Sequence, residues 1–301
     1  MIALAAMGGF FLLIRRASSL RDAMLLGWLF GVAHFTLGNN WIATAFTYQA
    51  NMPAVLGWVA VPLISLYLAL FPALAVGAAH LLAALLAGGR RGWPFALAFA
   101  GCWILAEWVR AWLFTGFAWN PFGVTLLGIF DRPGLAALAP WLGTYALSGL
   151  AVLIGSAAAL LLAQRRMVHL GILAALVTAG MFWPVGPGQR GTLRYTLVQP
   201  DIRQDVLNDS AYFEQSFQKT AALTLPRKPG ERRLVLWPES GVPDYLLDGY
   251  PQRYYDQMTA FGDPQLARVR LGRTIGPGSL LLTGTVDLEL RNGRAAGARN
   301  A

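Results

Sequence analysis

One carboxylate in this sequence follows a buried-strand pattern, where α/β proteins place reactive groups. In "LVLWPESGVPD", residues 234–244, four apolar residues lead into a proline, and Glu239 stands directly behind it. Such a run predicts a strand inside a sheet, and α/β domains keep their active sites beyond the carboxyl ends of these strands. The small Ser240 and Gly241 allow a sharp turn. Glu239 is therefore a candidate functional residue; a turn cap or a partner for a nearby arginine is the alternative.

A second candidate site combines charge with an apolar helix. In "EWVRAWLFTGFAWNPFG", residues 107–123, Glu107 and Arg110 are three residues apart, so we expect them to face one another. Ionisable residues inside a membrane are costly and usually mark function; a structural ion pair near the outer interface is the alternative. The glycine, asparagine and proline of "TGFAWNPFG" predict a helix break and a re-entrant loop at the mouth of a lipid-facing cavity. Glu107, Arg110 and Trp119 are thus candidates for substrate binding.

The other residue types that commonly catalyse reactions are isolated. The single cysteine, Cys102, lies in an apolar segment, where we interpret it as a small packing residue. His34 and His80 stand alone in apolar helices without the spacing of metal ligands, and we interpret both as packing residues. The sequence therefore predicts no metal site.

The elements that must position these residues follow from composition. Hydrophobic residues make up 56% of the chain and charged residues 13%, whereas soluble domains carry roughly 25% charged residues. Only 9 of the 24 basic and 3 of the 15 acidic residues lie within 1–187. We therefore expect a membrane part, 1–187, followed by a water-facing part, 188–301. The net charge of +9 comes without a basic run interleaved with aromatics, so no nucleic-acid partner is expected.

Apolar segments between arginine pairs predict a multi-pass α-helical membrane bundle. The segment 54–87 is longer than one crossing of about 20 residues requires, and Pro62 and Pro72 supply places to bend. The expected spans are residues 1–14 (partial), 23–41, 54–87, 94–114, 135–163 and 168–183. Arginines of the first, third and fifth loops predict cytoplasmic loops. Residues 188–301 then lie outside the cytoplasm, provided that 54–87 crosses once.

Residues 188–301 predict a layered α/β domain with the order β-α-β-α-β-β. Strands are expected in 191–202 and in 232–240 at the inside of the sheet. A third and a fourth are expected in 278–294, separated by a turn at Gly284, and "RNGR" indicates a hairpin turn. Helices are expected in 208–225 and in 250–270, the latter broken at Gly262–Pro264. The C-terminal "GRAAGARNA" is expected to be unstructured. Half a domain of this kind would expose an apolar sheet face and aggregate.

Five segments carry a family resemblance. "LVLWPES" (234–240) resembles the glutamate motif of the nitrilase, or carbon–nitrogen hydrolase, superfamily. Four more segments occur with it in order: "GWLFGVAHFTLGNNWI" (27–42), "EWVRAWLFTGFAWNPFG" (107–123), "LVQPDIRQD" (197–205) and "LLTGTVD" (281–287). Together with the membrane helices, they resemble the apolipoprotein N-acyltransferases of the bacterial inner membrane. The resemblance implies an incomplete nitrilase-like (αββα-type) extracytoplasmic domain on the periplasmic side.

The resemblance also implies a two-step acyl transfer. A cysteine thiolate takes the acyl chain of a phospholipid as a thioester, and the α-amino group of the diacylglyceryl-cysteine of an apolipoprotein then accepts it. Glu239 is implied as the general base, and a lysine stabilises each oxyanion. No cofactor is implied, because the thioester conserves the reactivity of the acyl group.

The sequence departs from this family pattern. The family's lysine and cysteine follow the glutamate, whereas Cys102, Lys219 and Lys228 all precede Glu239. Asn208 stands where an aromatic residue is expected. We therefore expect a chain truncated at both ends and, by itself, catalytically inactive. A membrane-tethered nitrilase-like amidohydrolase and a non-catalytic membrane scaffold or transporter are the alternative functions.

Overall fold

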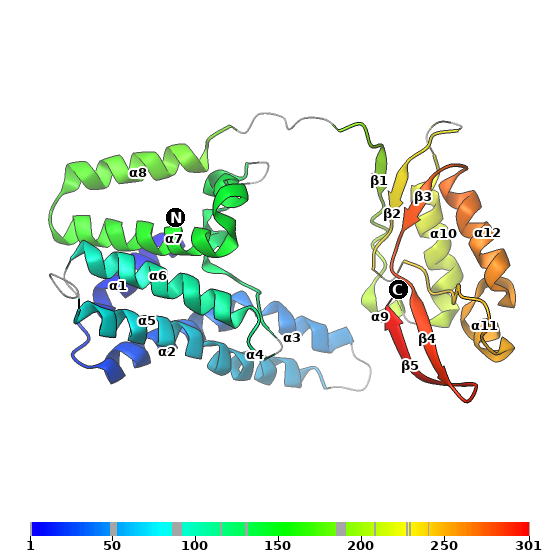
Figure 1. The fold of residues 1–301 in the computed structure, drawn as a ribbon, viewed down its shortest axis with the longest axis horizontal. Helices are drawn as coiled ribbons and strands as arrows, with labels where there is room; N and C mark the ends of the chain where they lie inside the picture. Colours follow the sequence, from blue (N-terminus) through cyan, green and yellow to red (C-terminus); the bar gives the residue numbers. More distant parts are fainter. Residues whose placement is uncertain are drawn as a thin grey trace. The chain divides into compact units, whose positions relative to one another are not determined.

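The computed structural model describes residues 2–48, 53–85, 92–114, 116–129, 132–184, 191–207, 209–226, 228, 230–239 and 241–300. The chain divides into two compact units, Met1–Pro187 and Gly188–Ala301, which are drawn in Figure 1. Asn208 and Ser240 lie outside the described residues, as do Arg90 and Arg91, the arginines of the third loop.

The first unit is helical. Its helices are α1 (Ile2–Ile14), α2 (Leu20–Gly38), α3 (Trp41–Ala45), α4 (Val55–Leu68), α5 (Leu70–Ala83), α6 (Trp93–Arg110), α7 (Ala139–Ala163) and α8 (Met167–Met181). Short 3-10 turns cover Phe46–Tyr48, Phe122–Leu126 and Gly134–Leu138. Of the described helical stretches, Val55–Ala83 and Gly134–Ala163 are long and apolar enough to cross a membrane, whereas Ile2–Ile14 and Met167–Met181 are shorter apolar helices.

The long apolar segment is interrupted close to a proline. Helices α4 and α5 together form a 29-residue stretch, Val55–Ala83, interrupted between Leu68 and Leu70. Pro72 has no amide hydrogen to donate to the carbonyl of Leu68, so the helical hydrogen-bond ladder is broken at that point. Pro62 lies inside α4. The helix is therefore interrupted at Ala69, one of the places near a proline where the sequence allowed a bend.

Aromatic and small residues build the core of this unit. The rings of Phe10 and Phe30 stack with centroids 4.2 Å apart, and Phe99 packs edge-on against Trp103 at 5.8 Å. Helices α1 and α7 cross closely, because a Cβ added at Gly8 would lie 2.8 Å from the carbonyl oxygen of Gly155. Small residues at such crossings let helix backbones approach.

The second unit contains a parallel sheet with helices on one face. Strands β1 (Tyr195–Leu197), β2 (Leu234–Leu236) and β3 (Leu280–Leu282) run parallel in the order β1-β2-β3. The prediction that 232–240 lies inside the sheet is confirmed, because β2 is the central strand. Helices α10 (Phe213–Thr224) and α12 (Pro264–Ile275) lie together beside the sheet in Figure 1. The shorter helices are α9 (Gln204–Leu207) and α11 (Gln252–Met258).

Alternation along the strands separates a buried face from a bare one. Val235 is fully buried and Trp237 is 6% exposed; the Trp237 ring packs against Phe217 of α10 at 6.1 Å and its Nε1 donates to Thr224 Oγ1 at 2.9 Å. The opposite face is apolar and uncovered. It exposes Tyr195 (64%), Leu197 (68%), Leu280 (72%) and Leu282 (60%). The expected uncovered apolar sheet face is confirmed.

The predicted break between the last two helices is also confirmed. Helix α11 ends at Met258, and Phe261 and Gly262 both have φ of 63°. Helix α12 then begins at Pro264, where the Asp263 carboxylate accepts hydrogen bonds from Gln265 N (2.7 Å) and Leu266 N (3.3 Å). A cap followed by proline at the first helical position is the usual start of a helix.

The prediction of an unstructured C-terminus is wrong. Strand β5 (Arg294–Asn300) pairs antiparallel with β4 (Val286–Arg291). The turn between them uses Asn292 (φ 51°) and Gly293 (φ 72°), the pair that favours a tight hairpin. The Tyr254 hydroxyl accepts a hydrogen bond from Ala295 N at 2.8 Å. Backbone pairing and this contact outweigh the low strand propensity of an alanine- and glycine-rich segment.

Candidate active site

Glu239 lies at the carboxyl edge of the parallel sheet. The ladder continues past the strands, with Val198 N donating to Leu236 O and Trp237 N donating to Leu282 O, both at 3.0 Å. Pro238 then ends the pairing, and Gly241 N donates to Pro238 O at 2.9 Å. Glu239 thus sits in a tight turn directly beyond the central strand, where the ends of the neighbouring strands converge. Its side chain is exposed.

Two glycines allow the backbone around Glu239 to pack closely. A Cβ added at Gly241 would lie 2.7 Å from Thr283 Oγ1 and 2.9 Å from the carbonyl oxygen of Pro238. At Gly284, in the turn after β3, an added Cβ would overlap the carbonyl oxygen of Glu239. The prediction that Gly241 serves a sharp turn is confirmed, and so is the turn at Gly284 between the third and fourth strands; the contact of Gly284 with Glu239 was not predicted.

Two cavities meet at Glu239. One, of about 180 Å³, is lined by Leu207, Phe213, Glu239, Val242, Pro243, Tyr245, Met258, Gly284, Thr285 and Val286. The other, of about 230 Å³, is lined by Gln199, Pro200, Asp201, Ile202, Leu207, Pro238 and Glu239. Most residues that line the first cavity are apolar, with Glu239 at its wall, and the second cavity is somewhat more polar. A group bound in either cavity can therefore approach the Glu239 carboxylate.

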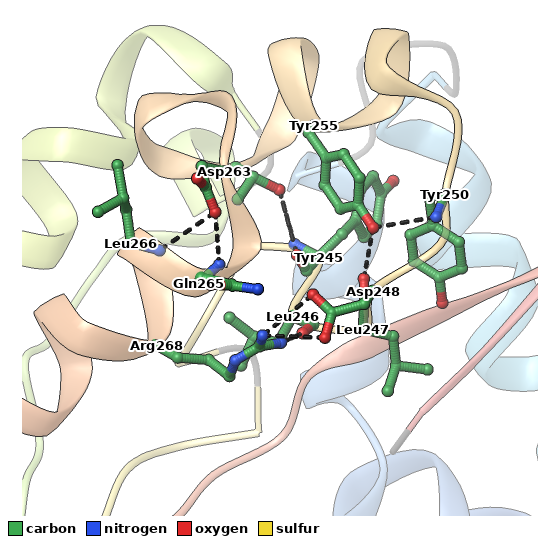
Figure 2. Close-up of polar contacts among 11 residues, drawn as sticks. Tyr245, Leu246, Leu247, Asp248, Tyr250, Tyr255, Asp263, Gln265, Leu266 and Arg268 are labelled. Atoms are coloured by element: carbon green, nitrogen blue, oxygen red, sulfur yellow. Dashed lines mark hydrogen bonds and ion pairs between the residues drawn. The ribbon is translucent and has the colours of Figure 1, made fainter.

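The segment that begins at Tyr245, which lines the first cavity, is held by polar contacts with the two helices that follow it in the chain, as Figure 2 shows. Thr259 Oγ1 accepts a hydrogen bond from Tyr245 N at 3.1 Å. The Tyr255 hydroxyl donates to Leu247 O at 2.6 Å and accepts from Tyr250 N at 3.0 Å. From α12, Arg268 donates to Leu246 O and to both carboxylate oxygens of Asp248 at 3.0 Å. The segment 245–250 is therefore fixed along its length.

Burial controls the ionisation of two residues at the start of this segment. Burial raises the pKa of the Tyr245 hydroxyl, and Tyr250 and Tyr254 raise it further, so the phenol stays protonated at neutral pH. Burial likewise raises the pKa of the Asp244 carboxyl, against the hydrogen bond from Ala260 N at 2.7 Å and the charge of Arg270. Among the described residues, Glu239 is the acidic residue that lines both cavities.

A lysine that the sequence did not single out supports the polar cavity. Lys219 Nζ, from α10, donates to the carbonyl oxygen of Asp201 at 2.9 Å. Asp201 lines that cavity and has a positive φ of 50°. No spacing in the sequence indicates this contact, because it joins the residues after β1 to a helix through packing. The one cysteine, Cys102, is buried on α6 of the other unit.

Glu107 and Arg110 bond to the segment that contains Trp119 and do not form an ion pair with each other. Glu107 Oε1 accepts hydrogen bonds from Trp103 Nε1 (2.9 Å) and Phe122 N (2.8 Å), and Arg110 Nη1 donates to the carbonyl oxygen of Trp119 at 2.7 Å. The ion pairs among the described residues do not join Glu107 to Arg110, so the alternative of a structural ion pair between them is not supported. The backbone carbonyl of Trp119 and the backbone amide of Phe122 bond the two charged side chains instead.

The segment 116–121 is non-helical, as Gly116, Asn120 and Pro121 predict. His34 also reaches this segment, with Nε2 lying 3.4 Å from Asn120 O; its interpretation as a packing residue was incomplete. Trp119 is 63% exposed and packs edge-on against Trp41 at 5.7 Å. The described residues include no cluster of three or more His, Cys, Asp or Glu side chains that could hold a metal ion.

Comparison with known proteins covers both units. A family model described as the apolipoprotein N-acyltransferase N-terminal domain matches residues 1–157. Proteins named apolipoprotein N-acyltransferase are similar over most of this chain. That of Brucella suis is 33% identical over 283 residues, covering 90% of this chain and 48% of the relative; that of Bordetella bronchiseptica is 31% identical over 278 residues, covering 85% and 50%. The chain spans about half the length of the curated relatives it matches.

Proposed function

Because the chain belongs to the apolipoprotein N-acyltransferase family, we propose that it serves the transfer of a phospholipid acyl chain to apolipoproteins. The acceptor is the α-amino group of an N-terminal diacylglyceryl-cysteine, and the acyl chain passes through a thioester acyl-enzyme. The observation that carries the proposal is the position of Glu239, an exposed carboxylate beyond the central strand and at the wall of two cavities.

Glu239 acts as the general base in both steps. It takes the proton of the thiol, the thiolate attacks the ester carbonyl, and the proton returns to the alcohol oxygen of the departing lysophospholipid. It then takes a proton from the acceptor ammonium, so that the neutral amine attacks the thioester and the thiolate leaves. An exposed carboxylate reached from two cavities fits a base that must meet two substrates in turn.

The nucleophile is not supplied by these 301 residues. Their one cysteine, Cys102, is buried in the helical unit, and Lys219 is engaged with the Asp201 carbonyl. We propose that the 301-residue chain alone forms no acyl-enzyme. It contributes the base and the lipid-embedded unit of an active site whose cysteine and oxyanion-stabilising lysine belong to another part of the parent protein.

The location follows from the charge pattern. The first unit lies in the bacterial inner membrane as a multi-pass bundle with its arginine-bearing loops in the cytoplasm, and residues 188–301 lie on the periplasmic side. Both substrates are lipids of the adjacent leaflet. The second unit is the first half of a nitrilase-like domain, and the bare face that exposes Leu197 and Leu282 is the face on which the second sheet of an αββα sandwich would pack.

Labelling tests the inactivity of the isolated chain. Incubation with a phospholipid carrying a radioactive acyl chain, followed by electrophoresis with and without hydroxylamine, detects a thioester directly. We expect no hydroxylamine-sensitive label on the 301-residue chain, and a labelled band would contradict the proposal.

A chimera tests the function itself. Residues 1–301 are joined to the remaining C-terminal half of the Brucella suis relative, and acyl transfer to a diacylglyceryl peptide is measured. Glu239→Gln should lower the rate by about 10²–10⁴-fold, the usual contribution of a general base. Glu231→Gln, which removes a partly buried carboxylate 3.8 Å from Arg194 and outside both cavities, should leave it unchanged. Release of ammonia from small amides without acyl transfer would favour an amidohydrolase instead.

A further inference from the structure

Side chains bond four backbone groups of residues 119–123, where the non-helical segment enters the 3-10 turn Phe122–Leu126. In order along 119–123, Trp119 O accepts from Arg110 Nη1 (2.7 Å) and Asn120 O lies 3.4 Å from His34 Nε2. Pro121 has no amide hydrogen, Phe122 N donates to Glu107 Oε1 (2.8 Å), and Gly123 N donates to Ser148 Oγ (2.8 Å). The four side chains come from α2, α6 and α7.

The two charges in this set cannot serve a ligand directly. Glu107 is 6% and Arg110 is 2% exposed. Arg110 also lies over the ring of Phe35, with its Cζ 4.9 Å from the centroid. Burying charges this deeply costs several kcal/mol per ion unless partners replace water, and here the partners are backbone groups of the segment. An irregular backbone inside a membrane is tolerated only where such partners exist.

We propose that Glu107 and Arg110 are positioning residues, whose task is to hold residues 117–123 in one conformation. The group that the segment presents is Trp119, 63% exposed and packed against Trp41 at 5.7 Å. Without the two charges, the segment would leave a carbonyl and an amide unsatisfied and would sample other conformations. This inference takes from the proposed function only the placement of the first unit in the membrane. Unsatisfied backbone groups are costly in that environment.

The two carboxylate oxygens of Glu107 have different surroundings. This difference allows a variant that removes the charge of Glu107 and keeps its hydrogen bonds. Glu107 Oε1 makes both hydrogen bonds, whereas Oε2 is buried with no hydrogen-bond partner among the described residues. A cavity of about 10 Å³, lined in part by His34, Glu107 and Arg110, adjoins it and has room for one water. Glu107→Gln keeps an oxygen that can accept both hydrogen bonds, and its amide nitrogen can donate to that water. Glu107→Ala removes the acceptor.

Amide hydrogen exchange of the 301-residue chain in nanodiscs, resolved to single amides, tests the proposal. Glu107→Ala should speed exchange of the Phe122 amide by about 10-fold or more, as expected for a lost hydrogen bond of about 1.4 kcal/mol. Glu107→Gln should restore most of the protection. Ser148→Ala should speed the Gly123 amide, whereas Ser156→Ala, which removes a buried hydroxyl with no partner among the described residues, should leave both amides unchanged.

Three results would overturn the proposal: no acceleration in Glu107→Ala, equal acceleration in Glu107→Gln, or acceleration that is uniform along α6 and α7. The last would mean that Glu107 stabilises the bundle generally and positions nothing. Because exchange requires no catalysis, failure of the acyl-transfer assay in the chimera would leave this result standing, and the two proposals fail independently.

Discussion

The α-carbon of Gly284 packs so closely on the carbonyl oxygen of Glu239 that no side chain fits between them. The turn after β3 therefore rests on the backbone that carries the candidate base. Gly241, on the other side of Glu239, is confined in the same way by Thr283 and Pro238. The carboxylate is thus positioned by main-chain packing on both sides, while its own side chain stays exposed.

Replacing Gly284 by alanine should therefore displace the turn that carries Glu239. We expect the free energy of unfolding of the second unit to fall by about 1–3 kcal/mol, the usual cost of overpacking. Trp237 is the single tryptophan of residues 188–301, so 19F NMR of a 5-fluorotryptophan label at Trp237 during urea titration reports on this unit. Gly272→Ala in α12, where an added Cβ meets nothing within 4 Å, should instead stabilise by about 1 kcal/mol.

Asp244 should make the second unit less stable as pH rises. Burial raises the pKa of its carboxyl, so the folded state holds the proton more tightly, and stability is lost between the unfolded pKa of about 3.9 and the higher folded one. Asp244→Asn keeps an oxygen to accept from Ala260 N and should raise the free energy of unfolding at pH 7. The gain should vanish below pH 4. A gain that persists there would contradict this assignment.

Glu214 should have the opposite dependence. Hydrogen bonds from Arg270 Nη2, at 2.7 and 2.6 Å, and then from Gln218 lower the pKa of the Glu214 carboxyl. Its stabilisation is present above the unfolded pKa of about 4.3 and is lost as pH falls through the lower folded one. Because the side chain is 60% exposed, Glu214→Gln should cost at most about 1 kcal/mol at pH 7. The urea midpoints of the variant and the wild type should converge in acid.

The bare sheet face should drive association of the 301-residue chain. Leu197 and Leu282 are 68% and 60% exposed, so Leu197→Thr with Leu282→Thr keeps strand propensity and removes apolar surface. We expect weaker binding of an apolar dye and a larger monomer fraction in size-exclusion chromatography. Val235→Thr on the buried face of β2 should instead unfold the unit. Unchanged association of the double variant would show that another surface causes it.

The β4–β5 hairpin should depend on its turn. Gly293 has φ of 72°, so Gly293→Ala should destabilise the hairpin by about 1 kcal/mol and speed amide exchange of the 294–300 segment several-fold. Gly297→Ala, in the middle of β5, should have a smaller effect, because the nearest atom to its added Cβ, Glu289 Oε2, is 3.6 Å away. Equal effects of the two substitutions would argue against the turn.

Local sequence patterns were sufficient to predict much of the protein's organisation. The contrast in charge separates residues 1–187 from 188–301, and the structure divides into compact units at the same place. The run Leu234–Trp237 is apolar on both faces, which only a central strand can bury, and the proline behind it fixes where pairing ends and Glu239 begins. Five ordered segments sufficed to predict the family, and that prediction is confirmed.

Tertiary structure decided the partners of each charge. Spacing puts Glu107 and Arg110 on one face of α6, but the backbone of residues 119–122, folded back on that face, takes both side chains. Lys219 meets Asp201, and Gly284 meets Glu239, only because strands and helices far apart in the chain are packed together. The alanine-rich β5 becomes a strand because β4 offers it a ladder. These contacts depend on which groups compete in space, and one-dimensional spacing contains no record of that competition.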